Sequence, residues 1–133
     1  MVRSLNDFLL GFSRLETFAT LFVGIIDLGA ATITYCSAGH PPALLVRAGA
    51  QEISMLDVQS GVVGAFADIS YQDGVVSVGE GDVLMLYTDG TTEARDPSGA
   101  FFGEQGLRDM LMRESAPDKP FEGFLDRLLA TLD

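Results

Sequence analysis

Apolar residues recur along this chain of 133 residues with two kinds of spacing, and each spacing predicts a type of element. Near the start they follow helical spacing, which predicts an amphipathic helix ending near Gly11: Val2, Leu5, Phe8, Leu9 and Phe12. Residues 18–28 and 31–38 are rich in β-forming side chains, with Gly29 between them. They predict two antiparallel strands joined by a tight turn.

Shorter strands are predicted at residues 43–47, 51–56, 74–78 and 83–87. Pro41 and Pro42 cannot extend a central ladder, so Gly-His-Pro-Pro before residue 43 predicts a turn. The glycine-containing segment 60–70 predicts a loop. These signals describe a run of antiparallel strands.

The pattern becomes helical again in the last third of the chain. Segment 103–115 places Leu107, Met110 and Leu111 on one helix face. A last helix over 121–133 is predicted to bury its apolar residues: Phe121, Phe124, Leu125, Leu128 and Leu129. A helix, antiparallel strands and two helices predict one α+β domain, residues 1–133.

Strand 18–28 is apolar on both faces, because its Phe, Leu, Val and Ile residues do not alternate with polar ones. An antiparallel strand of this kind needs cover on both sides. We therefore expect sheet packed against sheet, with helices outside.

Composition narrows the possible partners. The chain is 47% hydrophobic with mean hydropathy +0.27, but no apolar run approaches the roughly 18 residues of a membrane helix. Eight basic and 19 acidic residues give a net charge of −11, which disfavours nucleic acid and favours cations. The start lacks a secretion signal, and the single cysteine, Cys36, suits the cytosol, so we expect a cytoplasmic protein.

The stretch VLMLYTDGTTEARD, residues 83–96, changes abruptly from apolar to polar at Asp89. Val83–Tyr87 predicts a buried strand that follows the turn-like Gly79–Asp82. A carboxylate at the tip of such a strand is held by a scaffold yet open to solvent. It fits both a cation ligand and an ordinary turn aspartate.

Three stretches in order resemble one family: FATLFVGIIDLGAATITYCSAGHPPALLV, then GVVG, then GDVLMLYTDGTTEARDPSGAFFGEQGL. They are similar to the stage-II-sporulation-protein-E-like branch of the bacterial metal-dependent protein serine/threonine phosphatases, the PPM superfamily. The resemblance covers roughly residues 5–111. It implies an antiparallel β-sandwich flanked by helices, of which this chain holds the C-terminal portion.

The resemblance also implies chemistry. Family members hold two Mn²⁺ or Mg²⁺ ions at one edge of the sandwich, and water activated by these ions attacks phosphorus. Asp89 matches a metal-ligating aspartate, and hard divalent cations take oxygen ligands. Gly90 is expected to let the backbone turn sharply after Asp89. Thr88, Thr92 and Glu93 match positions that shape the loop and hold waters near the ions.

Three other side chains are interpreted as structural. His40, the single histidine, lies in the expected Gly-His-Pro-Pro hairpin, which favours turn chemistry over a general acid. Cys36 lies among apolar neighbours, so we expect its thiol to be buried in the core. Ser60 lacks the Gly-x-Ser-x-Gly frame of a nucleophile elbow.

Other acids of the family pattern have no match here: an earlier Gly-Asp, a Gly-Asp-x-x-Gly-His-Gly segment and a later Asp-Asp pair. A cation held by one carboxylate binds weakly, so we expect this chain alone to hydrolyse little. Uncovered apolar sheet surface predicts pairing of two copies through a sheet edge, and a monomer at micromolar concentration would contradict this.

The resemblance implies a substrate with phosphoserine or phosphothreonine on a small anti-sigma-factor antagonist protein, and an upstream sensory or response-regulator domain. Two alternatives stay open: a non-catalytic regulatory or binding module that keeps the phosphatase fold, and an unrelated α+β domain. The flanking coding sequence discriminates the first two, because it either contains the missing acids or lacks them.

Overall fold

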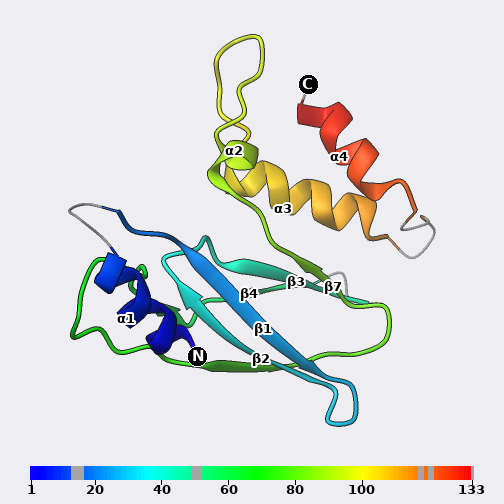
Figure 1. Cartoon of the computed structure of the whole chain (residues 1–133). Coiled ribbons are helices and arrows are strands. Elements are labelled where there is room, and N and C mark those ends of the chain that lie inside the picture. The colour runs from blue at the N-terminus through cyan, green and yellow to red at the C-terminus, as the bar shows by residue number, and fades with distance from the viewer. Residues whose placement is uncertain (13–16, 49–51, 117–118, 120–121, 133) are drawn as a thin grey trace. The chain divides into compact units, whose positions relative to one another are not determined.

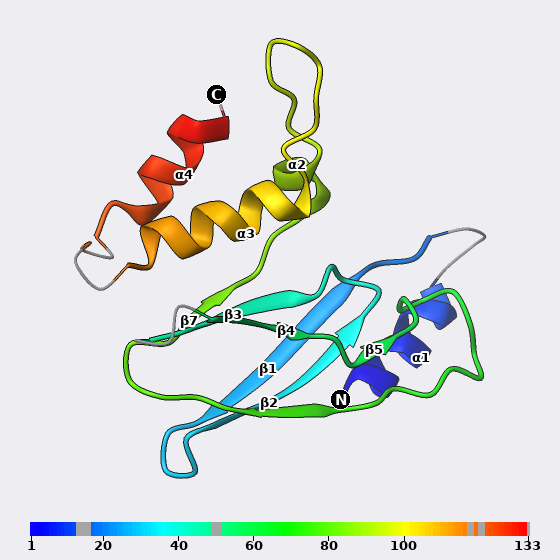
Figure 2. The same ribbon diagram turned by 180° about the vertical axis from the view of Figure 1, so that it is seen from behind.

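The computed structural model describes residues 1–12, 17–48, 52–116, 119 and 122–132. Two compact units are seen, one made of Met1–Pro42 with Leu56–Val78, the other of Ala43–Met55 with Gly79–Asp133. Each unit contains one sheet, and each is described by itself (Figures 1 and 2). The prediction of a single domain over 1–133 stays a prediction.

The first unit is built on the predicted hairpin. Strand β1 (Leu21–Asp27) pairs antiparallel with β2 (Thr32–Ala38), and β2 also pairs with β5 (Gln59–Ser60) and β6 (Gly74–Ser77). The Asp27 side chain accepts the Ala30 N–H at 2.8 Å and closes the turn. The strands predicted at 18–28, 31–38 and 74–78 are confirmed, with shorter bounds.

Helix α1 (Val2–Phe12) confirms the predicted opening helix and packs against this sheet. Its Val2 joins a small core with Cys36, Ala38 and Val63. The other buried residue of α1 is polar: Asn6 accepts the Gly64 N–H at 2.8 Å and donates to the Phe66 carbonyl at 3.0 Å. Asn6 therefore ties α1 to the predicted glycine loop, an anchor that hydrophobic periodicity cannot reveal.

Among the described residues, the expected cover on both faces of β1 is absent from its second half. Leu21–Val23 are half-buried, but Ile25 and Ile26 are 63% and 59% exposed, and successive residues of a strand point to opposite faces. This half of the edge strand β1 extends with β2 as a hairpin ribbon (Figure 1). Pairing of two copies at this edge stays a prediction.

The second unit contains a sheet in the order β4 (Glu52–Leu56), β3 (Ala43–Arg47), β7 (Val83–Met85). The strand expected at 83–87 ends at Met85, and its residues are half-buried rather than buried. Leu86, which follows the last paired residue, is exposed. The turn before it is confirmed: Asp82 accepts the Gly79 N–H at 2.9 Å. Gln51, the predicted start of β4, lies outside the described residues.

Three helices complete the second unit: α2 (Asp89–Thr92), α3 (Gly103–Glu114) and α4 (Phe124–Leu132). The predicted face of α3 is buried, and it packs with β3, Tyr87 and α4 in one core: Leu44, Val46, Tyr87, Leu107, Met110, Leu111, Phe124 and Leu128. Burial on this scale is the main stabilising term of the unit.

The predicted inward face of α4 is partly wrong. Phe124 and Leu128 are buried, but Leu125 and Leu129 are 63% and 58% exposed. Residues four apart form one stripe on a helix, and α4 buries the 124–128 stripe while the neighbouring stripe faces solvent. Phe121 lies outside the described residues.

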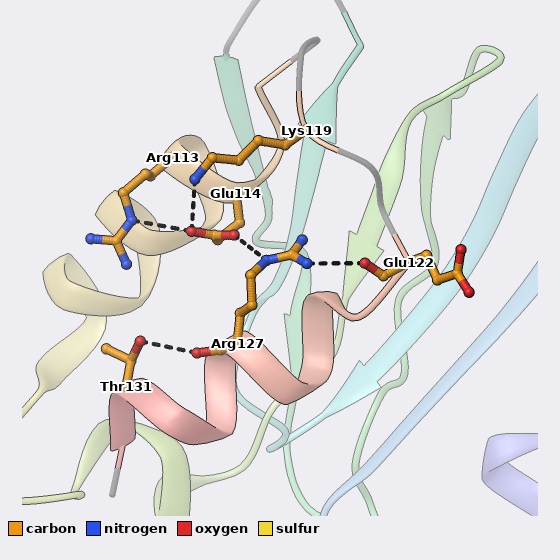
Figure 3. A network of polar contacts seen from close by, with 6 residues as sticks. All are labelled: Arg113, Glu114, Lys119, Glu122, Arg127 and Thr131. Carbon is orange, nitrogen blue, oxygen red and sulfur yellow. Dashed lines mark hydrogen bonds and ion pairs between the residues drawn. The ribbon is translucent and has the colours of Figure 1, made fainter.

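A charged network joins α3 to α4 (Figure 3). Glu114, 5% exposed, accepts hydrogen bonds from Arg127 Nε, from Lys119 Nζ at 3.0 Å and from Arg113 Nε at 3.3 Å. Arg127 also donates to the Glu122 carbonyl at 3.0 Å. The bonds from Arg127 and then Lys119 lower the pKa of Glu114 from 4.5 to about 2.

Within the part of the chain that the structure describes, no helix has the length and apolar character needed to cross a bilayer.

The α4 correction gives a first prediction. Leu111→Ala, at a fully buried site, should lower the free energy of unfolding by about 2–5 kcal/mol. Leu129→Ala, on the exposed stripe, should change it by less than about 0.5 kcal/mol. Urea denaturation followed by circular dichroism measures both. An equal loss in the two variants would contradict the assigned helix faces.

The Glu114 network gives a second prediction, on pH. Because its pKa in the folded state is lowered to about 2, the ionised carboxylate stabilises the fold fully above pH 4.5 and loses that effect as pH falls toward 2. Glu114→Gln should therefore be less stable than the natural chain at neutral pH, and the gap should close on acidification. Urea midpoints across this pH range measure it, with the exposed Glu104→Gln on the same helix as control. A gap that does not depend on pH would contradict the network.

Candidate functional site

Asp89 begins helix α2 and is exposed, directly after a strongly anchored residue. Tyr87 is 7% exposed and packs in the core with Leu44 and Leu107. Burial, followed by the nearby Glu104 charge, raises the pKa of Tyr87. Thr88 is extended, with φ −118° and ψ 169°, and carries the chain from Tyr87 into the helix. The core thus holds the backbone two residues before the carboxylate.

Sequence reasoning missed Tyr87 as the anchor of this site. In the sequence, Tyr87 is only the last apolar position of a predicted strand. A signal was present, since a large aromatic residue at the boundary between an apolar run and a polar turn often has its ring buried.

The residues after Asp89 form one helical turn rather than the expected loop. The Asp89 carbonyl accepts the Glu93 N–H at 2.7 Å and the Thr92 hydroxyl at 3.3 Å. The Thr88 carbonyl accepts the Thr91 N–H at 2.9 Å. Of Asp89 and Thr88, these bonds engage only the main-chain carbonyls. Among the described residues, no hydrogen bond or ion pair engages the Asp89 carboxylate, which leaves it open to water or a cation.

The predicted reason for Gly90 is not the one that the structure shows. Gly90 lies inside α2 without a positive φ, and an added Cβ would meet only the Thr88 hydroxyl at 3.8 Å. The change of direction falls earlier, where Thr88 is extended and Asp89 is helical. The roles expected of Thr88, Thr92 and Glu93 in holding waters stay predictions.

A second aspartate fixes the other end of β7. Asp82 accepts the Ala48 N–H at 2.8 Å, the Gly79 N–H at 2.9 Å and Arg47 Nη1 at 3.0 Å. Burial raises the pKa of Asp82, but these hydrogen bonds outweigh burial and hold the pKa below its usual value. Asp82, directly before β7, is thus engaged in hydrogen bonds, whereas the carboxylate of Asp89, which follows β7 in the chain, stays accessible.

A hairpin, residues 94–102, follows α2. The Phe102 N–H donates to the Ala94 carbonyl at 2.7 Å, and the Asp96 N–H donates to the Ala100 carbonyl at 3.0 Å. The Asp96 carboxylate accepts the Ser98 hydroxyl at 2.6 Å, the Ser98 N–H at 2.8 Å and the Ala100 N–H at 3.0 Å. The bond from the Ser98 hydroxyl is the largest cause that lowers the pKa of Asp96. Gly99 has φ +87°, which suits glycine at the tip.

The donor chemistry at Asp89 fits a hard divalent cation, because a free carboxylate is the ligand that Mn²⁺ and Mg²⁺ prefer. The number of donors does not make a complete site. No group of three or more His, Cys, Asp or Glu side chains gathers within the described ranges. The described residues around Asp89 therefore offer a single open carboxylate and not a full coordination shell.

The three side chains interpreted as structural have structural roles. Cys36 is 6% exposed, and burial raises the pKa of its thiol, which disfavours a reactive thiolate. His40 Nδ1 contacts the Pro41 carbonyl at 2.9 Å inside the predicted turn. The Ser60 hydroxyl accepts the Gln72 N–H at 2.9 Å.

The chain matches the family model of Stage II sporulation protein E (SpoIIE) over residues 1–133. It therefore belongs to this family, which confirms the resemblance seen in the three sequence stretches. The matched range includes Asp89 and the helix α2 that it begins.

Two relatives illustrate the match in sequence. The chain is 32% identical over 111 residues to protein IcfG of Synechocystis sp., covering 83% of this chain and 17% of IcfG. It is 34% identical over 108 residues to the phosphoserine phosphatase RsbP of Bacillus subtilis, covering 80% of this chain and 24% of RsbP. The chain thus spans less than a quarter of either relative.

Solved structures confirm the predicted fold class. The RsbU and RsbW domains of Rv1364c from Mycobacterium tuberculosis match with a TM-score of 0.67 at 23% identity, over 96% of this chain and 33% of that one. The phosphatase domain of SpoIIE from Bacillus subtilis, presoaked with Mn, matches with a TM-score of 0.66 at 16% identity, over 98% and 56%. The chain is an α+β protein whose strands pair antiparallel, apart from the short parallel pairing of β2 with β5, and its fold matches part of the SpoIIE phosphatase domain structure.

The open carboxylate gives a third prediction, on cation binding. Added Mn²⁺ should broaden the amide NMR signals of Thr88–Gly90 first, because a paramagnetic ion at Asp89 relaxes the nearest protons most strongly. Asp89→Asn should abolish this selective broadening. Asp126→Asn, an exposed aspartate in the first turn of α4, is the matched control and should leave it unchanged. The same selective broadening in the Asp89→Asn variant would refute the assignment.

Proposed function

We propose that this chain is the C-terminal part of a metal-dependent protein serine/threonine phosphatase domain. Its substrate is phosphoserine or phosphothreonine on a regulatory protein of the anti-sigma-factor antagonist type. The observation that carries the proposal is the Asp89 carboxylate, exposed and without a hydrogen-bond partner among the described residues, two positions after the buried Tyr87. Membership of the SpoIIE family supports it.

In this proposal Asp89 is one ligand to Mn²⁺ or Mg²⁺, with two ions in the complete domain. Such ions supply an activated water and neutralise charge on the phosphoryl oxygens. The role of this chain is to position the Asp89 carboxylate. Tyr87 fixes the backbone before it, and α2 holds the residues that follow. A flexible carboxylate would lose conformational entropy on binding, and this placement removes part of that cost.

The names of two relatives support the proposed substrate class. RsbP is named a phosphoserine phosphatase, and so is RsbU of Bacillus subtilis, which is 29% identical over 82 residues. An upstream sensory or response-regulator domain and a cytoplasmic location complete the proposal. The net charge of −11 supports a role without nucleic acid.

A second function is favoured by one observation: the described residues contain no cluster of three metal-ligating side chains. A non-catalytic binding module that keeps the phosphatase fold needs no such cluster. The two functions make different predictions for a longer polypeptide, extended by the flanking coding sequence, because only a catalytic domain gains activity when further acids are added.

The fourth prediction tests catalysis. Phosphate release from p-nitrophenyl phosphate and from a phosphoserine protein is measured against Mn²⁺ concentration, for this chain and for the longer polypeptide. We expect little turnover by the chain alone, because one carboxylate holds a cation weakly. In the longer polypeptide, Asp89→Asn should lower kcat roughly a hundredfold or more, since a metal ligand is lost.

Asp126→Asn again serves as the control and should leave kcat unchanged. Unchanged activity of the Asp89→Asn longer polypeptide would refute the ligand role. An inactive longer polypeptide would favour the binding module. Full activity of the 133-residue chain would overturn the proposal that its site is partial.

A further inference from the structure

The hairpin 94–102 displays an unusual pair of side chains. The Arg95 guanidinium lies over the Phe101 ring, 3.9 Å from its centroid, and Nη1 donates to the Gly99 carbonyl at 2.8 Å. Arg95 and Phe101 also bridge the two arms of the hairpin. Both residues are exposed, and Phe101 is 56% exposed. The cation and the ring are thus held together at the surface.

This pair does not serve the core. Phe101 is not among the buried residues of the second unit, and the hairpin is already closed by the Asp96 hydrogen bonds. Arginine and aromatic residues are the types most enriched where proteins bind partners, because they bury a large area with few rotatable bonds lost. A preorganised hairpin lowers the entropy cost of binding further.

The hairpin adjoins the candidate metal ligand along the chain. It leaves helix α2, which begins at Asp89, and it returns to the chain at the start of α3; Figure 1 shows it projecting from the place where these helices meet. A hollow of about 280 Å³ lies beside it, lined in part by Pro97, Phe101 and Leu132. The hollow has the size to take one side chain of a bound peptide.

We propose that this hairpin is the docking element for the polypeptide segment that carries the phosphorylated serine or threonine. Arg95 binds an anionic group of that segment, and Phe101 with the adjoining hollow takes an apolar side chain near the phosphorylated residue. The inference rests on the proposed function, since it names how the same site selects its protein substrate.

The local charge of the hairpin favours an anionic occupant, because the Arg95 guanidinium is exposed at its surface. A phosphorylated peptide needs a cation at the point of contact, and Arg95 provides a planar donor suited to phosphate and carboxylate oxygens. Self-association that depends on the hairpin is a further outcome, measured by sedimentation velocity of the natural chain, Arg95→Ala and Phe101→Ala.

The experiment measures binding without catalysis. An array of short fluorescent phosphoserine peptides with varied flanking residues is screened in EDTA, and the best binder is titrated by fluorescence anisotropy. Arg95→Ala and Phe101→Ala should each weaken binding about tenfold, as expected for an interface hot spot. Leu125→Ala removes a similarly exposed apolar side chain at the far end of α4 and should have no effect.

Two further measurements exclude loss of the hairpin as the cause. The amide NMR signals of Ser98 and Ala100 report the Asp96 hydrogen bonds and should persist in the variants. Arg95→Gln keeps a donor for the Gly99 carbonyl but has no charge, and it should weaken binding as Arg95→Ala does. Unphosphorylated peptide should bind less tightly than its phosphorylated form.

Variants that bind as tightly as the natural chain, no phosphopeptide binding at all, or hairpin-dependent self-association would each overturn the inference. The outcome is separable from that of the proposed function. Metal-dependent hydrolysis without any effect of Arg95 or Phe101 would overturn the docking role alone. Hairpin-dependent peptide binding by a protein that never hydrolyses phosphate would overturn catalysis alone.

Discussion

An acidic side chain can be kept in water at a defined position only if the backbone next to it is fixed elsewhere, and here Tyr87 fixes it. Its ring lies in the core formed by β3, α3 and α4, while Asp89, two residues on, is exposed. The direction of α2 and the start of the hairpin 94–102 follow from this anchor. Loss of the core around Leu107 and Leu111 would therefore release the candidate site as well as the helices.

The acidic residues of the second unit divide into two classes by their partners. Asp82, Asp96 and Glu114 accept hydrogen bonds from backbone N–H groups, from the Ser98 hydroxyl or from cationic side chains, and these bonds lower the pKa of each below its usual value. Hydrogen bonds of this kind stabilise the charged form and occupy acceptor positions of the carboxylate. Asp89 has no such bond among the described residues, so its exposed carboxylate stays accessible to a cation.

Much apolar surface stays exposed in the described chain. Ile25 and Ile26 on β1 and Phe8 and Phe12 on α1 are each more than half exposed. The relatives and solved structures that the chain matches are longer than it is, and the chain covers 56% of the SpoIIE phosphatase domain structure. Large apolar side chains exposed to this extent are typical of surfaces that bind another segment or another chain.

The sequence by itself determined most of the elements, their order and the family, because periodicity, turn residues and motif spacing are local properties. It did not predict β5 or α2, and it extended the strand before Asp89 to Tyr87, whereas β7 ends at Met85. Only the tertiary structure decided which helix stripe of α4 is buried, that Asn6 joins α1 to the Gly64 loop, and that residues 89–92 form a helix. These features depend on which neighbour each side chain meets, and a one-dimensional pattern does not contain that information.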